Sequence, residues 1–177
     1  MYFELKENRP HGAPEHPFSL YHIKNVPHAF QIPVHWHDEL EIIYVKSGSV
    51  HVTISGEHYI GNPGDAFVVS PGNLHFMGSR TGDVDYYTFL FPLEFVSFQM
   101  NDLSEQMLMA PLKSGRMLFQ IQIGKSIEDL CEHLLVLYAG EGDVRNPIRT
   151  TVPKDSAKRI SFVAKQMETK MILLEFL

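Results

Sequence analysis

Two histidines and a glutamate lie within seven residues and are the side chains best suited to chemistry. They occupy the run VHWHDELEIIYVKSG (residues 34–48), where His35 and His37 are separated by one residue and Glu41 follows four residues later. A third histidine, His75, ends a second run, GDAFVVSPGNLH. Imidazole nitrogens and a carboxylate oxygen are a ligand set that suits Zn²⁺, Fe²⁺, Ni²⁺ or Mn²⁺. The same four residues can instead line a polar pocket that contacts an organic ligand directly.

A single continuous strand cannot bring these groups together. Residues two apart on a strand face the same way with Cα atoms about 7 Å apart, so His35 and His37 would share a face. Glu41 would then lie a further ~13 Å along the strand. The pair Asp38-Glu39 favours a turn, so we expect a new strand to start near Glu41 and to run back beside the histidines. A Pro-Gly turn before His75 would bring all four side chains to one interior point.

The spacing of apolar residues predicts a mainly β fold followed by helices. Residues 1–17 are rich in proline and form an irregular arm. Residues 18–123 contain short runs of β-branched and aromatic residues, which favour a jelly-roll β-barrel. From residue 124 the apolar period becomes 3.6, so 124–177 is expected to form a helical hairpin. The expected strands are Ser19–His22, Ala29–His37, Glu41–Lys46, Ser49–Ile54, Glu57–Ile60, Ala66–Ser70, Leu74–Gly78, Asp85–Pro92 and Met117–Ile123.

The second helix of the hairpin is expected to mediate dimerisation. Its predicted apolar stripe includes Val163, Met167 and Met171, and a stripe of this kind favours association with another helix. The last seven residues, MILLEFL, contain no residue that typically ends a helix. We therefore expect the hairpin to be truncated and to be followed by further sequence in the full-length protein.

Composition limits the functional classes. The formal net charge is −6, whereas a nucleic-acid-binding module usually presents a basic face, so this chain is expected to bind DNA poorly. The single cysteine, Cys131, cannot form an internal disulfide, which favours a reducing compartment. No run approaches the ~18 consecutive apolar residues of a membrane span, and the amino terminus lacks a signal-peptide pattern. We expect a cytoplasmic protein without a membrane partner.

The run that carries the histidine pair resembles the first motif of the cupin superfamily. That motif is commonly written G-x5-H-x-H-x3-4-E-x6-G, and the chain follows it residue for residue from His35 to Gly48. Ala29 stands where the leading glycine belongs. The departure falls on a turn position and leaves the histidines and the glutamate intact.

The second cupin motif, G-x5-P-x-G-x2-H-x3-N, is matched in part. Gly64, Gly72 and His75 occupy its glycine and histidine positions. Ser70 and Ser79 replace its proline and asparagine. The fold implied by this resemblance is the cupin barrel, and the ligand set implied for a metal is His35, His37, Glu41 and His75.

The wider pattern resembles the amino-terminal half of AraC-type transcriptional regulators. It consists of HGAPEHPFSLYHI near the start, the two histidine runs, and a helical hairpin after the barrel. The resemblance covers residues 11–177 and is strongest over residues 30–78. It implies a homodimer that senses a small-molecule effector inside the barrel. In that family DNA is bound by a carboxy-terminal pair of helix-turn-helix motifs, which this chain lacks.

Several aromatic rings are expected to line the barrel interior beside the four polar residues. They can stack on a sugar or an aromatic effector, although each can also be ordinary core. Ligand-binding candidates are therefore His35, His37, Glu41, Tyr44, Phe67, His75 and Tyr87, with Phe76 and Phe89 as further interior rings.

A metal-dependent cupin enzyme is the alternative function. It would be a dioxygenase, isomerase or decarboxylase in which the ion polarises the substrate or activates oxygen. The two predicted helices favour the sensor, because association needs them and a closed barrel does not. We expect no catalytic residues and no organic cofactor.

Overall fold

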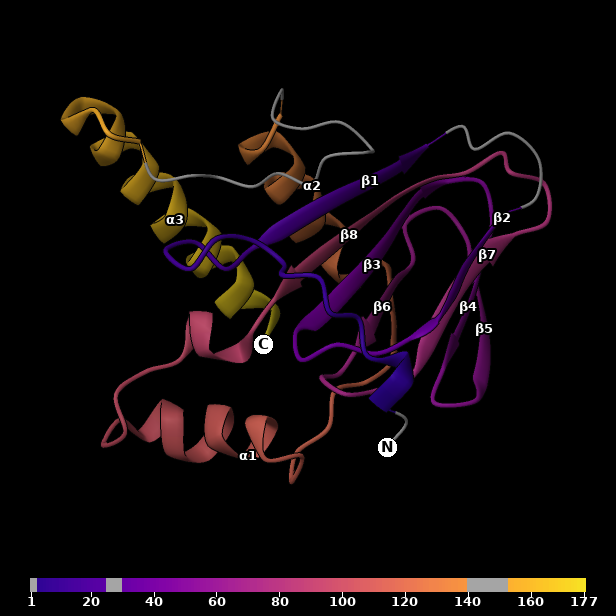
Figure 1. The fold of residues 1–177 in the computed structure, drawn as a ribbon, viewed down its shortest axis with the longest axis horizontal. Helices are drawn as coiled ribbons and strands as arrows, with labels where there is room; N and C mark the ends of the chain where they lie inside the picture. Colours follow the sequence, from indigo (N-terminus) through magenta and orange to yellow (C-terminus); the bar gives the residue numbers. More distant parts are fainter. Residues whose placement is uncertain (1–2, 25–29, 140–152) are drawn as a thin grey trace.

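Two antiparallel sheets form the body of the protein in the computed structural model, which describes residues 3–24, 30–139 and 153–177 (Figure 1). The predicted mainly β architecture is confirmed, although Ala29, placed in the second predicted strand, lies outside the described residues. The five-stranded sheet has the order β1 (Ser19–Lys24), β8 (Asp85–Phe91), β3 (Leu40–Ser47), β6 (Ala66–Val69) and β9 (Gln122–Gly124). The four-stranded sheet has the order β2 (Phe30–His35), β7 (His75–Ser79), β4 (Val50–Ile54) and β5 (Glu57–Gly61).

Strand β3 is buried on both faces, and this divides the apolar residues into two cores. Successive side chains of a strand point to opposite faces. Ile43 and Val45 belong to an inner core between the sheets, whereas Ile42 and Tyr44 belong to an outer core on the other face of the five-stranded sheet. The inner core is completed by Val50, Val52, Ile54, Phe67, Val69, Met77, Val84 and Tyr86.

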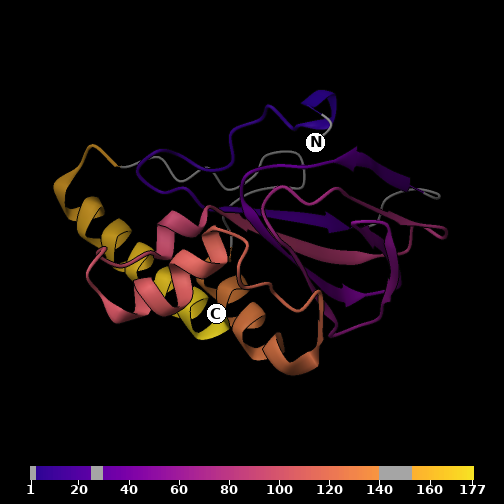
Figure 2. The same ribbon diagram turned by 90° about the horizontal axis from the view of Figure 1, so that it is seen from below.

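Two helices cover the outer core. Helices α2 (Glu128–Leu137) and α3 (Ser156–Phe176) pack against each other beside the five-stranded sheet (Figure 2). Asp155 caps α3, because its side chain accepts a hydrogen bond of 3.0 Å from the backbone N–H of Lys158. Residues 140–152 of the predicted connection, including Pro147, lie outside the described residues. Across the described chain, no helix combines the length and the apolar character that crossing a membrane requires.

The segment after β8 departs from the prediction. A strand was expected over Met117–Ile123, but only Gln122–Gly124 pairs in a sheet. The preceding residues form η2 (Leu93–Val96), a π-helical turn η3 (Glu105–Met109) and α1 (Ala110–Lys113), none of which was predicted. The physical reason is packing, since the buried side chains of this segment add to the outer core. These side chains are Leu93, Phe95, Val96, Met109 and Leu112.

Short helical turns also flank the barrel. The turn η1 (Phe3–Leu5) lies in the arm, and η4 (Lys125–Ile127) precedes α2. Ser126 lies inside η4, and its hydroxyl donates to the carbonyl of Ile123 at 3.1 Å. Helix α2 begins directly after η4, at Glu128.

The turn between β3 and β4 requires a glycine, and this generates a stability prediction. Gly48 has φ +78°, and a Cβ atom there would lie 2.1 Å from the carbonyl oxygen of Asp83. Gly56 has φ +89° but open space around the same position, so it is a matched control. Gly56→Ala should lower the free energy of unfolding by about 1 kcal/mol, the cost of positive φ alone. Gly48→Ala should cost roughly 2 kcal/mol more, because backbone must move to relieve the clash.

Urea denaturation of the two variants and the wild type measures this difference. Equal losses in the two variants would show that the turn relaxes freely around an added methyl group.

Candidate functional site

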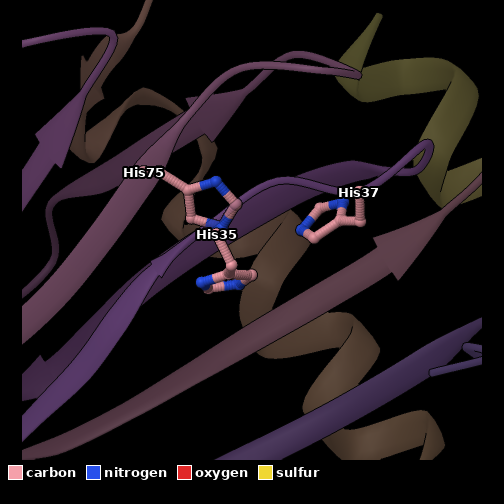
Figure 3. A group of neighbouring side chains, drawn as sticks. All are labelled: His35, His37 and His75. Carbon is pink, nitrogen blue, oxygen red and sulfur yellow. The ribbon is translucent and has the colours of Figure 1, made fainter. Parts of the chain in front are cut away.

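The three motif histidines meet where the chain passes from one sheet to the other (Figure 3). His35 ends β2 and His75 begins β7, and the two residues are partners across these strands. The next strand, β3, belongs to the opposite sheet and carries Glu41. His37 lies in the link between the sheets, followed by a bend at Asp38 and Glu39. The predicted turn is confirmed, and it produces the convergence.

The three histidines lie close enough to one another to hold one ion, and Glu41 lies beside two of them. One ring nitrogen from each of His35, His37 and His75 lies within 4.8 Å of the others. Oε2 of Glu41 lies 3.3 Å from Nε2 of His37 and 3.0 Å from Nε2 of His75. His37, Glu41 and His75 are buried, and His35 is partly exposed.

Each of the three rings is oriented through its other nitrogen. Nδ1 of His35 lies 2.8 Å from the carbonyl oxygen of Pro33, and Nδ1 of His75 lies 2.9 Å from that of Asn73. Nδ1 of His37 lies 3.1 Å from the carbonyl oxygen of Glu39. A carbonyl oxygen can only accept, so Nδ1 carries the proton in each ring. The Nε2 atoms are thereby left as the ring atoms available to coordinate a metal.

Charge inside the site is balanced around Glu41. Burial alone would raise the pKa of this carboxyl, but His37 and His75 outweigh it and hold the pKa well below its usual range. For His37, burial lowers the pKa, yet the hydrogen bond and negative charge of Glu41 raise it overall. For His35, burial and the charge of His75 lower the pKa, which favours the neutral ring. The site is thus built around a permanent carboxylate.

A divalent metal fits this donor set. In its neutral form, with Nδ1 donating to Asn73, the His75 ring presents a lone pair at Nε2. This atom is buried and lies 3.0 Å from Oε2 of Glu41, so it forms a hydrogen bond with the carboxylate only when it carries a proton. Two acceptor atoms that face each other in a buried site repel unless a cation lies between them. Three imidazoles and one carboxylate match the preferences of Zn²⁺, Ni²⁺, Fe²⁺ and Mn²⁺.

A cavity of about 180 Å³ adjoins the site. Part of its wall comes from the N-terminal arm, which supplies Glu7, Arg9 and His11. The sequence pattern did not predict that the arm lines the cavity. The arm has no periodicity, and its contact with His35 joins residues more than twenty positions apart. The barrel side is lined by Tyr21, Ile23, Ile32, His35, His37, Glu41, Met77, Thr88 and Leu90.

The predicted aromatic ligands do not all face the interior. Phe67 belongs to the inner core, as expected. Tyr44 and Tyr87 are neighbours across β3 and β8 and belong to the opposite face of the sheet, where the outer core lies. Their predicted interior position is wrong, because they alternate with the inward-facing residues of their strands. Phe89 also belongs to the outer core, and Phe76 faces a different hollow.

The outward face of Tyr44 has a structural use. Its hydroxyl donates a hydrogen bond of 2.7 Å to Glu132 on α2, and Lys46 forms an ion pair with the same carboxylate. Tyr87 stacks on His22 with ring centroids 4.1 Å apart. The contacts of Tyr44 and Lys46 with Glu132 attach α2 to the sheet on the side away from the histidines.

A larger hollow lies outside the barrel. It has a volume of about 780 Å³ and is lined by the four-stranded sheet, including His51, His58, Phe76 and Arg80. It contains none of His35, His37, Glu41 and His75. His58 is exposed and bonded to Thr53 at 2.7 Å, in agreement with its expected surface role.

Comparison with known proteins identifies the family. The family described as AraC-like ligand binding domain matches residues 17–148. Together with the two antiparallel sheets, this match confirms the predicted cupin fold. None of the curated proteins searched is similar enough in sequence to match.

Solved structures show partial similarity. KdgF from Halomonas sp. is 27% identical, with a TM-score of 0.36, over 37% of this chain and 61% of that one. A RmlC-like cupin from Shewanella frigidimarina is 30% identical, with a TM-score of 0.33, over 36% of this chain and 57% of that one. A cupin protein from Bacteroides fragilis is 24% identical, with a TM-score of 0.36, over 42% and 64%. The matched part spans less than two thirds of each of these structures.

The placement of Tyr44 generates a prediction that separates stability from binding. Tyr44→Phe removes a hydrogen bond to the Glu132 carboxylate and should lower the free energy of unfolding by about 1.5 kcal/mol. Metal binding should not change, because the hydroxyl lies on the other side of the sheet. Tyr59→Phe is the matched control, since its hydroxyl also bonds a carboxylate, that of Glu57 two residues away on an edge strand. Its loss should stay below about 0.5 kcal/mol.

Thermal and urea unfolding measure the stability, and metal titration measures the binding. A loss of metal affinity in Tyr44→Phe would contradict the assigned separation of the two faces.

Proposed function

We propose, on the premise that this chain belongs to the AraC-like ligand-binding domain family, that its barrel senses a small-molecule effector in the cavity beside the histidines. The observation that supports this best is the convergence of three oriented Nε2 atoms on one point next to a cavity. Polar groups that converge beside an apolar wall are typical of a ligand site. In the full-length protein the sensor would control a DNA-binding region outside this chain.

The proposed site contains one divalent metal ion held by His35, His37, Glu41 and His75. When bound, the ion would supply a positive charge that anchors oxygen atoms of the effector. The residues themselves orient the three imidazoles and hold the carboxylate ionised. The volume of about 180 Å³ lies below the usual range of drug-sized pockets, so the effector should be small. A compact oxygen-rich molecule such as a sugar fits these properties.

Signal transmission in this proposal runs through the arm as well as the barrel. Nε2 of His16, at the end of the arm, lies 2.8 Å from the hydroxyl of Tyr138, just after α2. The same hydroxyl lies 2.7 Å from Oγ1 of Thr169 on α3. All three side chains are buried, so the bonds are protected from water. An effector that binds one arrangement of the arm better than another would therefore shift the arrangement of the helices.

A metal-dependent enzyme is the second candidate function. The observation that favours it is that Glu7 and His11 place a carboxylate and an imidazole at the cavity wall, where they can transfer protons. We propose binding without turnover. Recovery of the effector unchanged, measured by NMR after prolonged incubation with the metal-loaded protein, supports the sensor, and its conversion supports the enzyme.

The proposed homodimer forms through the exposed face of α3. Four apolar side chains on this helix are exposed although the helix is packed on its other side through Ile172 and Leu173. They are Ile160, Val163, Met167 and Met171, with exposed fractions of 75%, 49%, 60% and 58%. Three of them belong to the stripe predicted to mediate dimerisation. An apolar helix face of this kind favours association with a second copy.

The first prediction of the proposal concerns metal and effector together. Protein purified without chelator or a His-tag should contain close to one divalent ion per chain by elemental analysis, and a His35→Ala/His37→Ala variant should contain almost none. Metal-loaded wild type should then be stabilised by its effector in a thermal screen of monosaccharides and small hydroxy acids. At a hundredfold excess over Kd the gain is about 2.7 kcal/mol.

His133→Ala is the control, because His133 is an exposed histidine bonded to Glu168 on the helices. It should match the wild type in both measurements. Equal metal in all three proteins, or none in any, would mean that the four residues form a polar pocket without a metal.

The second prediction concerns the dimer. Met167→Glu places a charge in the exposed stripe of α3 and should yield monomers in analytical ultracentrifugation. Met107→Glu is the matched control, because Met107 is 70% exposed but lies in the turn η3. It should leave the dimer intact. A dimer that survives Met167→Glu would remove α3 from the interface.

A further inference from the structure

The N-terminal arm is attached directly to the segment that carries two of the histidines. The backbone N–H of Glu7 donates to the carbonyl of Trp36 at 2.9 Å, and the N–H of Trp36 donates to the carbonyl of Leu5 at 3.1 Å. Between them, Lys6 pairs with Trp36 as a parallel bridge and forms an ion pair with Asp38. Trp36 lies between His35 and His37 in the chain. The bridge therefore places Glu7 beside the proposed metal ligands.

The carboxylate of Glu7 faces the metal-binding atom of His35. Its Oε2 lies 3.7 Å from Nε2 of His35, whose Nδ1 is already bonded to the backbone. Two atoms that each bind the same ion at about 2.1 Å lie roughly 3 to 4 Å apart. The separation between Glu7 and His35 is thus compatible with two neighbouring ligands on one ion. Glu7 also lines the cavity.

A fourth histidine, His11, lies next to this carboxylate. Nε2 of His11 lies 3.5 Å from Oε2 of Glu7, and Nδ1 of His11 lies 2.8 Å from the hydroxyl of Tyr21 on β1. The His11 side chain is almost fully buried and packs edge-on against the ring of His37. His11 lies beside Glu7 without being a predicted ligand itself, so a positive charge on its ring would attract the carboxylate.

We propose that Glu7 is a further protein ligand of the metal, supplied by the arm to the site formed by His35, His37, Glu41 and His75. The proposal rests on the metal site of the proposed function. It adds that binding of the ion closes the arm over the cavity, because Glu7 is joined to the arm and to the ion at once. The arm segment before Glu7 should therefore be less accessible when metal is bound.

Metal affinity tests the ligand role. The Kd for Zn²⁺, measured by competition with a chromophoric chelator on the full untagged chain, should rise on the order of tenfold to a hundredfold in Glu7→Gln. Glu4→Gln is the matched control, since Glu4 is an exposed glutamate of the same arm. It should bind Zn²⁺ like the wild type. Unfolding of the metal-free proteins should be the same in all three, which excludes a loss of fold.

Two further readouts distinguish a ligand from a structural residue. Acetate at millimolar concentration should restore part of the Zn²⁺ affinity of Glu7→Ala, because it can supply the missing carboxylate, and should do nothing for Glu4→Ala. Zn²⁺ should slow trypsin cleavage after Lys6 in wild type relative to metal-free protein, and this ratio should approach one in Glu7→Gln. Trp36 is the sole tryptophan, so its fluorescence should report the same arm movement.

The outcomes separate this inference from the proposed function. Zn²⁺ binding that is equal in wild type and Glu7→Gln, with equal protection of the arm, would overturn the role of Glu7 and leave the four-residue site standing. A wild type that binds no Zn²⁺ would overturn both. Weaker binding in Glu7→Gln with rescue of Glu7→Ala by acetate would establish the fifth ligand.

Discussion

The buried carboxylate of Glu41 is the constraint around which this barrel is organised. An ionised carboxylate in an apolar interior is costly unless it is paired and hydrogen-bonded. It lies on β3, on the same strand face as Ile43 and Val45 of the inner core, and it is 3% exposed. The short link from β2 to β3 lowers this cost. It crosses from one sheet to the other and places His37 beside the Glu41 carboxylate. Pairing of β2 with β7 then adds His35 and His75.

The compensating cation can be a proton or a metal ion, and the two compete. Nδ1 of His37 donates to the Glu39 carbonyl, while its Nε2 lies 3.3 Å from Glu41. Both nitrogens can donate only in the charged imidazolium, which agrees with the raised pKa of His37. A metal bound at Nε2 would have to displace that proton. Metal binding is therefore linked to pH, and the proton becomes the stronger competitor as the pH falls.

Much of the fold was predictable because it follows from local patterns. Turn residues and strand-forming runs located the strands, and the turn at Asp38-Glu39 followed from the need to bring Glu41 back to the histidines. What could not be predicted depends on contacts between distant segments. The face of Tyr44 was assigned wrongly because β3 is apolar on both sides and shows no alternation. Glu7 and His11 were missed because an irregular arm has no period that relates it to the barrel.

The helical turns between Leu93 and Lys113 show the same limit. Their apolar residues could equally have belonged to a strand, since short apolar runs do not distinguish the two. Packing against the outer core favours helical turns over a strand here, and such packing between distant segments is not visible in the sequence. The buried Glu105, paired with Lys113, is a further sign that this segment folds as a unit.

Two physical connections join the site to the helices, and they run in different directions. Strand β3 carries Glu41 toward the cavity and, three residues on, Tyr44 toward Glu132 of α2. The arm carries Glu7 to the cavity and, nine residues on, His16 to the hydrogen-bonded chain that ends on α3. The strand is fixed by continuous pairing on both sides, whereas the arm near Glu7 is attached by one isolated bridge, the Lys6–Asp38 ion pair and the His11–Tyr21 contact. A ligand can change an equilibrium only through a difference in affinity between two arrangements. The arm has no continuous strand pairing to break, so under the proposed function it is the element that an effector would move at the lower cost.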